Sequence, residues 1–367
     1  MCNTKRTVLI AMVICVAFTG VCSAVSKQPT VTELLGKYAE TQDKLQNYSL
    51  KLHEDTDFKA RLSGDWAHAS GARKKHASDL IRTDGQRFYI ESDRSGQVFV
   101  GSGVFPKDDP THNIWAWDGV YYWSYRIGPK SLRKPDGRDF HGMVSVTKGA
   151  TEEYIKGSIN YHGGDKYLKG FSFIGIGRID KVLKDTKKLS VRKPMVKVNG
   201  SKCYVINGAT KYGRILLYID PGHGYNIAKA KIIKKTGDII LGTKDKIMPG
   251  GDSNRTTLEN VRFEKISGTW FPMEADTVAV VNSANGDFTQ IKTHVKRTEL
   301  ILNPDHRDLG AFRPDLPDGA AVHFVNIEGI DVNKKYTWQD GAVIGADGKK
   351  IDIEKLVKKT KKLENKF

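Results

Sequence analysis

Cysteine is scarce in this chain of 367 residues, which contains four. Cys2, Cys15 and Cys22 lie in the N-terminal segment, and the fourth is Cys203. Once that segment is removed, a lone cysteine can form neither an internal disulfide nor a zinc site built from several thiolates. The fold is therefore expected to depend on packing alone, with Cys203 as a buried thiol on a strand.

Long apolar runs are also scarce, and the run at the N-terminus is short. Two basic residues precede an apolar stretch over residues 8–18, and small residues follow it. This pattern predicts that residues 1–24 are a cleaved secretory signal peptide and that the protein is exported to the periplasm as a soluble chain. An uncleaved anchor would need a longer run, and lipid attachment at Cys22 would need a small residue in place of Val21.

Acidic residues are outnumbered, with 42 Asp and Glu against 59 Lys and Arg, and the net charge is +17. The predicted signal peptide carries two of the positive charges, so the exported chain keeps +15. Such a charge attracts anionic partners, among them phospholipid headgroups and anionic wall polymers. Because export separates the chain from nucleic acid, none is expected as a partner. A basic surface that serves only solubility is the other interpretation.

Motifs of catalysis and metal binding are missing as well. The sequence has no HExxH, no GxSxG elbow, no Walker loop and no CxxC pair. Three SxxK tetrapeptides and a KTG at Lys235 lack the third motif of penicillin-binding enzymes, and chance explains them in a lysine-rich chain. We predict no catalytic residue, no metal and no cofactor. A hydrolase with dispersed residues, His162 among them, stays an alternative.

The sequence does contain one amphipathic helix followed by many strands. Thr30 and Glu33 have the spacing of a capping box, and apolar residues then recur at helical intervals as far as Leu45. From Tyr48 onward, short alternating runs are separated by Asp-Gly, Asn-Gly and Asp-Pro-Gly turns. Successive hairpins without long helices between them predict an α+β protein that is mainly an antiparallel sheet.

Other segments depart from this pattern. Polar loops are predicted over residues 60–77 and most of 128–170, and a short helix over 179–189. Residues 303–320 are rich in Pro, Asp and Gly and are expected to form a connection. Residues 321–367 are expected to form a small C-terminal segment that ends in a basic helix, which lies either on an anionic membrane surface or on its own domain.

A surplus of apolar residues on strands with few helices to cover them suggests a cavity. A single antiparallel sheet with a helix on its concave face can enclose an apolar space. The residues that we expect to line it are Leu34, Leu35, Tyr38, Trp115, Trp117, Tyr122, Phe173 and Trp270. Ordinary core packing is the alternative interpretation of each.

The order of these parts resembles the outer-membrane lipoprotein-sorting (LolA/LolB-like) superfamily, especially its larger exported bacterial members. The likeness rests on the N-terminal helix, the Asp118-Gly119 hairpin and the segments 198–206, 217–225 and 268–272, and it covers roughly residues 30–302. It implies an unclosed β-barrel, over residues 25–302, that wraps around helices and carries acyl chains of lipids or lipoproteins without catalysis. This chain is longer, more basic and extended at its C-terminus.

The function expected on these grounds is that of a periplasmic carrier or sensor which binds acylated ligands in an apolar cavity. The alternative is a basic envelope scaffold that binds anionic polymers or membrane surfaces. A protein partner cannot be named from the sequence.

Overall fold

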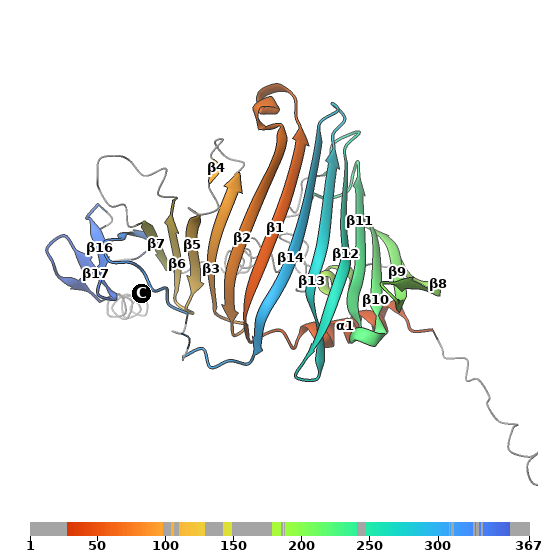
Figure 1. Ribbon diagram of the computed structural model, residues 1–367, viewed down its shortest axis with the longest axis horizontal. Helices are drawn as coiled ribbons and strands as arrows, with labels where there is room; N and C mark the ends of the chain where they lie inside the picture. Colours follow the sequence, from red (N-terminus) through yellow and green to blue (C-terminus); the bar gives the residue numbers. More distant parts are fainter. Residues whose placement is uncertain are drawn as a thin grey trace, which may run out of the picture.

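The computed structural model (Figure 1) describes residues 28–97, 104–105, 110–128, 142–148, 178–184, 186, 188–240, 247–307, 309, 312–325, 327, 330–331 and 333–352. Its helical elements are α1 (Val31–Gln42), η1 (Gly64–Ala69), α3 (Ile179–Leu183) and η4 (Pro221–His223). Its strands are β1 (Tyr48–Arg61), β2 (Gly71–Thr83), β3 (Phe88–Gln97), β4 (Val104–Phe105), β5 (Thr111–Trp117), β6 (Tyr121–Ile127), β7 (Met143–Lys148), β8 (Leu189–Val198), β9 (Ser201–Thr210), β10 (Gly213–Asp220), β11 (Asn226–Lys235), β12 (Ser253–Ile266), β13 (Thr269–Asn282), β14 (Phe288–Leu302), β15 (Ala321–Val325), β16 (Tyr336–Gln339), β17 (Ala342–Gly345) and β18 (Lys350–Ile351).

The strands form one large curved sheet that stays open (Figure 1). The pairings run from β8 through β9, β10, β11, β12, β13 and β14 to β1, and then through β2, β3, β5, β6, β7, β15, β16 and β17 to β18. Neighbours are antiparallel, except that β7 and β15 are parallel. Within the residues described, β8 and β18 do not pair with each other. The predicted unclosed antiparallel half-barrel with few helices is therefore confirmed.

Helix α1 forms because its first turn is capped and one of its faces is apolar. Thr30 Oγ1 accepts a hydrogen bond from the Glu33 N–H at 3.2 Å, and the Glu33 carboxylate accepts one from the Thr30 N–H at 2.6 Å. This confirms the capping box. The helix ends at Gln42, before the expected Leu45. Its buried side chains pack, with those of α3, against one side of the sheet near β8 and β11.

Tight turns connect the strands where the sequence predicts them. Asn199 and Gly200, between β8 and β9, have φ values of 47° and 91°. Positive φ at both central residues is the pattern of a type I′ turn, which glycine and asparagine tolerate. On β9, Cys203 is fully buried, and this burial raises the pKa of its thiol to about 12. The predicted buried thiol is confirmed.

Both predicted loops contain strands. Within residues 60–77, β1 continues to Arg61 and β2 begins at Gly71, so the connection shrinks to residues 62–70. Polar residues extend these strands because their backbones keep pairing with neighbours while many of their side chains face solvent. Within residues 128–170, Met143–Lys148 forms β7. The helix predicted over 179–189 ends at Leu183, because β8 begins at Leu189.

Two apolar cores lie on opposite faces of the sheet. We call the side that packs against α1 the inner face and the other side the outer face. The inner core joins α1 and α3 to most of the strands. The outer core lies on β3, β5, β6 and β7 and is covered by apolar side chains from residues 312–343. The aromatic run Tyr121–Tyr125 is therefore buried on both faces of β6, except at Ser124, which is half-buried.

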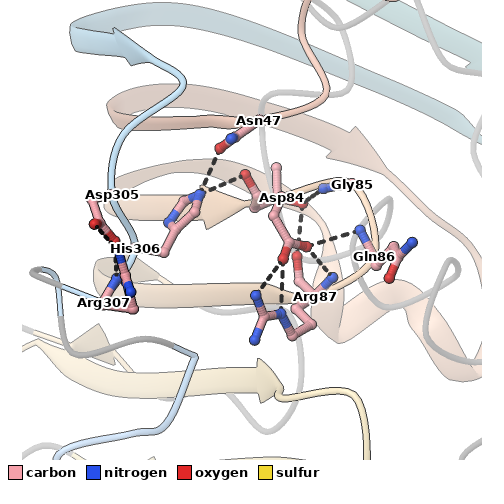
Figure 2. Close-up of polar contacts among 9 residues, drawn as sticks. Asn47, Asp84, Gly85, Gln86, Arg87, Asp305, His306 and Arg307 are labelled. Atoms are coloured by element: carbon pink, nitrogen blue, oxygen red, sulfur yellow. Dashed lines mark hydrogen bonds and ion pairs between the residues drawn. The ribbon is translucent and has the colours of Figure 1, made fainter.

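A buried histidine fixes the chain where it leaves β14 toward the outer face, as Figure 2 shows. His306 Nε2 lies 2.7 Å from Asn47 Oδ1 and 3.1 Å from the Thr83 carbonyl oxygen, so it donates to both. The adjacent β2–β3 turn is closed by Asp84, whose carboxylate accepts from the N–H groups of Gln86 and Arg87. These contacts hold the C-terminal segment beside the end of β2.

Some predicted features lie outside the described residues: the signal peptide, Phe173, His162 and the basic helix after residue 352. In the part of the chain that is described, no helix combines the length and the apolar character needed to cross a membrane.

Candidate functional site

The structure brings together most of the residues that were predicted to line a cavity. Six of the eight belong to, or pack against, the single inner core: Leu34, Leu35, Tyr38, Trp115, Trp117 and Tyr122. Trp270 is elsewhere, with its ring edge-on to His223 at a centroid distance of 4.7 Å. Phe173 lies outside the described residues. The structure shows these residues as part of a packed core, so it does not test the prediction that they line a cavity.

The inner face of β1–β6 is organised in rows of residues that oppose one another across the strands. Successive rows on one face are about 6.7 Å apart, because every second residue points to the same side. The first row contains Tyr48, Thr83, Phe88, Trp117 and Tyr122, and the second contains Leu50, Ile81, Ile90, Trp115 and Ser124. Both are mainly apolar and buried.

Further along the same strands, the inner face becomes polar. The third row contains Leu52, Asp79, Ser92 and Asn113, and the fourth contains Glu54, Ala77, Arg94 and Thr111. Lys75 follows on β2, opposite Thr56. One sheet face thus changes from apolar to charged within three rows.

The polar side chains contact one another as a group, which we call the inner charged cluster: Glu54, Lys75, Asp79, Ser92 and Arg94. Ser92 Oγ donates to Asp79 Oδ1 at 2.5 Å, and Arg94 Nε donates to Ser92 Oγ at 2.9 Å. Lys75 Nζ lies 3.0 Å from Glu54 Oε1. The Arg94 guanidinium lies over the Trp115 ring, 5.4 Å from its centroid, so the cluster directly borders the apolar rows.

Asp79 is the most perturbed group of the inner charged cluster. Only 2% of its surface is exposed. Burial raises the pKa of its carboxyl to about 6, and the Ser92 hydroxyl and the charge of Arg94 act in the opposite direction. Asp79 therefore changes charge close to neutral pH, unlike an exposed aspartate.

The inner face of β1–β6 thus consists of buried apolar rows, followed at one end by cations and hydrogen-bonding groups. Among the residues described, no group of three or more His, Cys, Asp or Glu side chains could hold a metal ion.

The sequence analysis missed the inner charged cluster, although local signals pointed to it. The Asp84-Gly85 turn fixes the register of β2 and β3, which places Ile81 opposite Ile90 and Asp79 opposite Ser92. Counting back from the turn would have shown a polar pair on the same face as an apolar pair. Arg94, opposite Ala77 in the same hairpin, follows from the same count. Glu54 could not be added in this way, because it lies on β1.

No protein-family model and no curated protein matches the chain. Among solved structures, it is similar to a DUF1329 family protein from Desulfovibrio piger, with 13% identity, a TM-score of 0.33, and 76% of this chain and 95% of that one covered. It is also similar to the MucA/MucB complex structure from Pseudomonas aeruginosa, with 7% identity, a TM-score of 0.21, and 74% and 99% covered. At these TM-scores, the likenesses assign neither a family nor a ligand.

Proposed function

We propose that the protein is an exported, non-catalytic carrier or sensor that binds an acylated ligand along the inner face of β1–β6. The observation that supports this is the change from two apolar rows to the inner charged cluster along the same strands. An acylated lipid or lipoprotein has the same polarity, with a hydrocarbon chain attached to a polar head.

The apolar rows would supply most of the binding free energy. Each methylene group that moves from water to an apolar surface contributes about 0.8 kcal/mol. Ile81, Ile90 and Trp115 form a flat apolar strip of the second row, in line with the Phe88 and Trp117 of the first. Because these side chains are buried, an acyl chain that lies along the strands would contact both rows by displacing the groups that cover them.

The inner charged cluster would orient the ligand. Lys75 and Arg94 carry positive charges that suit a phosphate or carboxylate group. Because Arg94 lies over Trp115, a head group held by Arg94 would leave the attached chain at the start of the apolar rows.

Two matched serine substitutions on opposite faces test the site. Ser124 is half-buried and opposes Trp115 in the second inner row, whereas Ser78 is exposed on the outer face of β2. In native mass spectrometry, protein purified from its own envelope should carry acylated species, and should take up added palmitoyl-oleoyl phosphatidylglycerol. Ser124→Phe should lose this uptake because its ring fills the second row, and Ser78→Phe should keep it.

Equal uptake by both variants would contradict the location of the site. A folded protein that stays free of lipid and takes up none would contradict the function. Binding to anionic vesicles that disappears at high salt would then favour the basic envelope scaffold, because exposed charges are screened over about 8 Å at physiological ionic strength.

A further inference from the structure

A second recess lies on the outer face, where the C-terminal segment meets β2, β3 and β6. Its volume is about 1050 Å³. This is at the upper end of the size range of small-molecule sites in proteins. It is separate from the inner face, because neighbouring residues of a strand point to opposite sides. On β2, Ile81 lies in the second inner row, while the adjacent Arg82 lines this recess.

Aromatic side chains from both parts of the chain form the walls. Tyr89 of β3 and Tyr121 and Trp123 of β6 come from the outer face of the sheet, and Trp338 comes from β16. Trp123 and Trp338 meet edge to face, with ring centroids 6.0 Å apart and an interplanar angle of 86°. Rings from segments more than 200 residues apart in sequence are therefore held in a fixed arrangement.

Arg82 is a buried donor at this recess. It is 7% exposed, and its guanidinium is stacked on the Tyr89 ring, 4.0 Å from the centroid. Within the described part of the chain, its buried Nε has no hydrogen-bond partner. A buried N–H group without a partner is rare and costs free energy, so the Arg82 Nε is a donor that a ligand in the recess could satisfy.

The charges that line the recess are balanced. Three cationic side chains, Arg82, Arg313 and Lys350, are accompanied by three carboxylates, Asp118, Asp315 and Asp352. Asp118 already accepts hydrogen bonds from the N–H groups of Val120 and Tyr121 and from Trp123 Nε1, so it mainly fixes the β5–β6 turn. A recess without net charge does not select for an anion or a cation.

We propose that this outer recess binds a neutral glycan, a role that is independent of the acyl site on the inner face. Each sugar hydroxyl both donates and accepts hydrogen bonds, so a lining that contains both cationic donors and carboxylate acceptors can satisfy it. The C–H faces of a sugar ring are apolar and pack on aromatic side chains such as Trp123 and Trp338. An acyl chain offers no hydrogen bonds to a lining with this many charged groups, and a phosphorylated ligand would meet as many carboxylates as cations, which gives it no net attraction.

The test uses the full chain labelled with 5-fluorotryptophan, which reports on six tryptophans separately once each ¹⁹F signal is assigned. The probes are maltotriose, cellotriose and the trimer of N-acetylglucosamine, with glucose 6-phosphate as the anionic comparison. At least one neutral trisaccharide should shift the signals of Trp123 and Trp338 and leave Trp66, which is 68% exposed on η1, unchanged.

Two variants complete the test. Trp338→Ala should weaken the binding of that trisaccharide about tenfold, which corresponds to roughly 1.4 kcal/mol of lost ring stacking. Trp66→Ala should leave the affinity unchanged. If Trp338→Ala does not fold, the map of shifts in the unsubstituted protein decides alone.

The proposal is overturned if no neutral trisaccharide shifts the two recess signals, if glucose 6-phosphate binds more tightly than all of them, or if Trp338→Ala binds the sugar normally. Saturating the protein with phosphatidylglycerol should leave the sugar shifts unchanged, and failure of the acyl site alone would not alter them.

Discussion

The two faces of β2 and β3 differ in how they place polar groups. On the inner face, charged residues lie together at one end of an apolar surface, with Asp79, Ser92 and Arg94 in direct contact. On the outer face, charges surround aromatic rings within one recess, with Arg82 stacked on Tyr89. Separated polarity suits an amphiphile, and mixed polarity suits a polyhydroxylated ligand. Because successive residues of a strand point to opposite faces, one short stretch of β2 and β3 contributes to both sites.

The largest expected effect tests whether the inner rows are packed as a core. Ile81→Ala should lower the free energy of unfolding by about 2–5 kcal/mol, because Ile81 is buried against both neighbouring strands. Ser78→Ala, three residues earlier and exposed on the outer face, should change it by less than about 0.5 kcal/mol. Urea unfolding measures the free energy of unfolding of both variants. Equal losses would contradict the difference in packing between the two faces.

The next effect concerns the buried charge of the inner charged cluster. Because the pKa of folded Asp79 is raised to about 6, the folded state binds more protons than the unfolded state between about pH 4 and pH 6. Stability from this group is thus complete below its unfolded pKa and is lost as the pH rises through about 6. Asp79→Asn keeps an acceptor for Ser92 and should stabilise the protein at pH 7 by up to about 3 kcal/mol.

This gain should disappear when unfolding is measured near pH 4. A gain in stability that stays constant from pH 4 to pH 7 would show that burial does not raise the pKa of Asp79. The positive charges of the inner charged cluster would then compensate for the burial of the carboxylate.

The smallest effect belongs to an ion pair on the outer face. His112 Nδ1 lies 2.8 Å from Asp93 Oδ1, and this hydrogen bond raises the pKa of His112 above its usual value of 6.5. The pair therefore stabilises the fold at low pH, and its contribution is lost as the pH rises through the folded pKa. Asp93→Asn should return the pKa toward 6.5 by NMR titration and cost less than about 1 kcal/mol at pH 5.

An unchanged His112 titration in Asp93→Asn would assign the raised pKa to Glu91, whose Oε1 lies 3.7 Å from His112 Nε2.

The elements that were predicted correctly are those determined by residues close together in the sequence. The capping box at Thr30, the Asn199-Gly200 turn and the alternation that follows it each depend on residues a few positions apart. The loop predicted over residues 60–77 is too long, since only residues 62–70 connect β1 to β2, because polar composition was taken as a sign of irregular backbone. There the backbone pairs regardless of side-chain polarity, with Phe58 opposite both Ile291 and Arg73.

Both candidate sites depend on pairings that no local pattern encodes. Tyr48 of β1 opposes Leu302 of β14, and Val144 of β7 opposes Val322 of β15, across very long separations in sequence. The first pairing joins β1 to β14, whereas Glu54 is placed beside the β2–β3 hairpin by the pairing of β1 with β2. The second brings the C-terminal segment over the outer face. The aromatic residues could be recognised from the sequence. Whether each one lies on the inner or the outer face of the sheet could not be predicted.

The most direct test of the acyl site is quenching of tryptophan fluorescence by phosphatidylglycerol with brominated acyl chains, because bromine quenches on contact. Trp115 lies in the second inner row, and Trp66 is exposed far from it. The account predicts that the lipid quenches the unsubstituted protein and Trp66→Phe alike, and that quenching is reduced in Trp115→Phe, where Trp117 of the first row stays quenched. Quenching that is undiminished in Trp115→Phe would contradict the binding of acyl chains along the inner face.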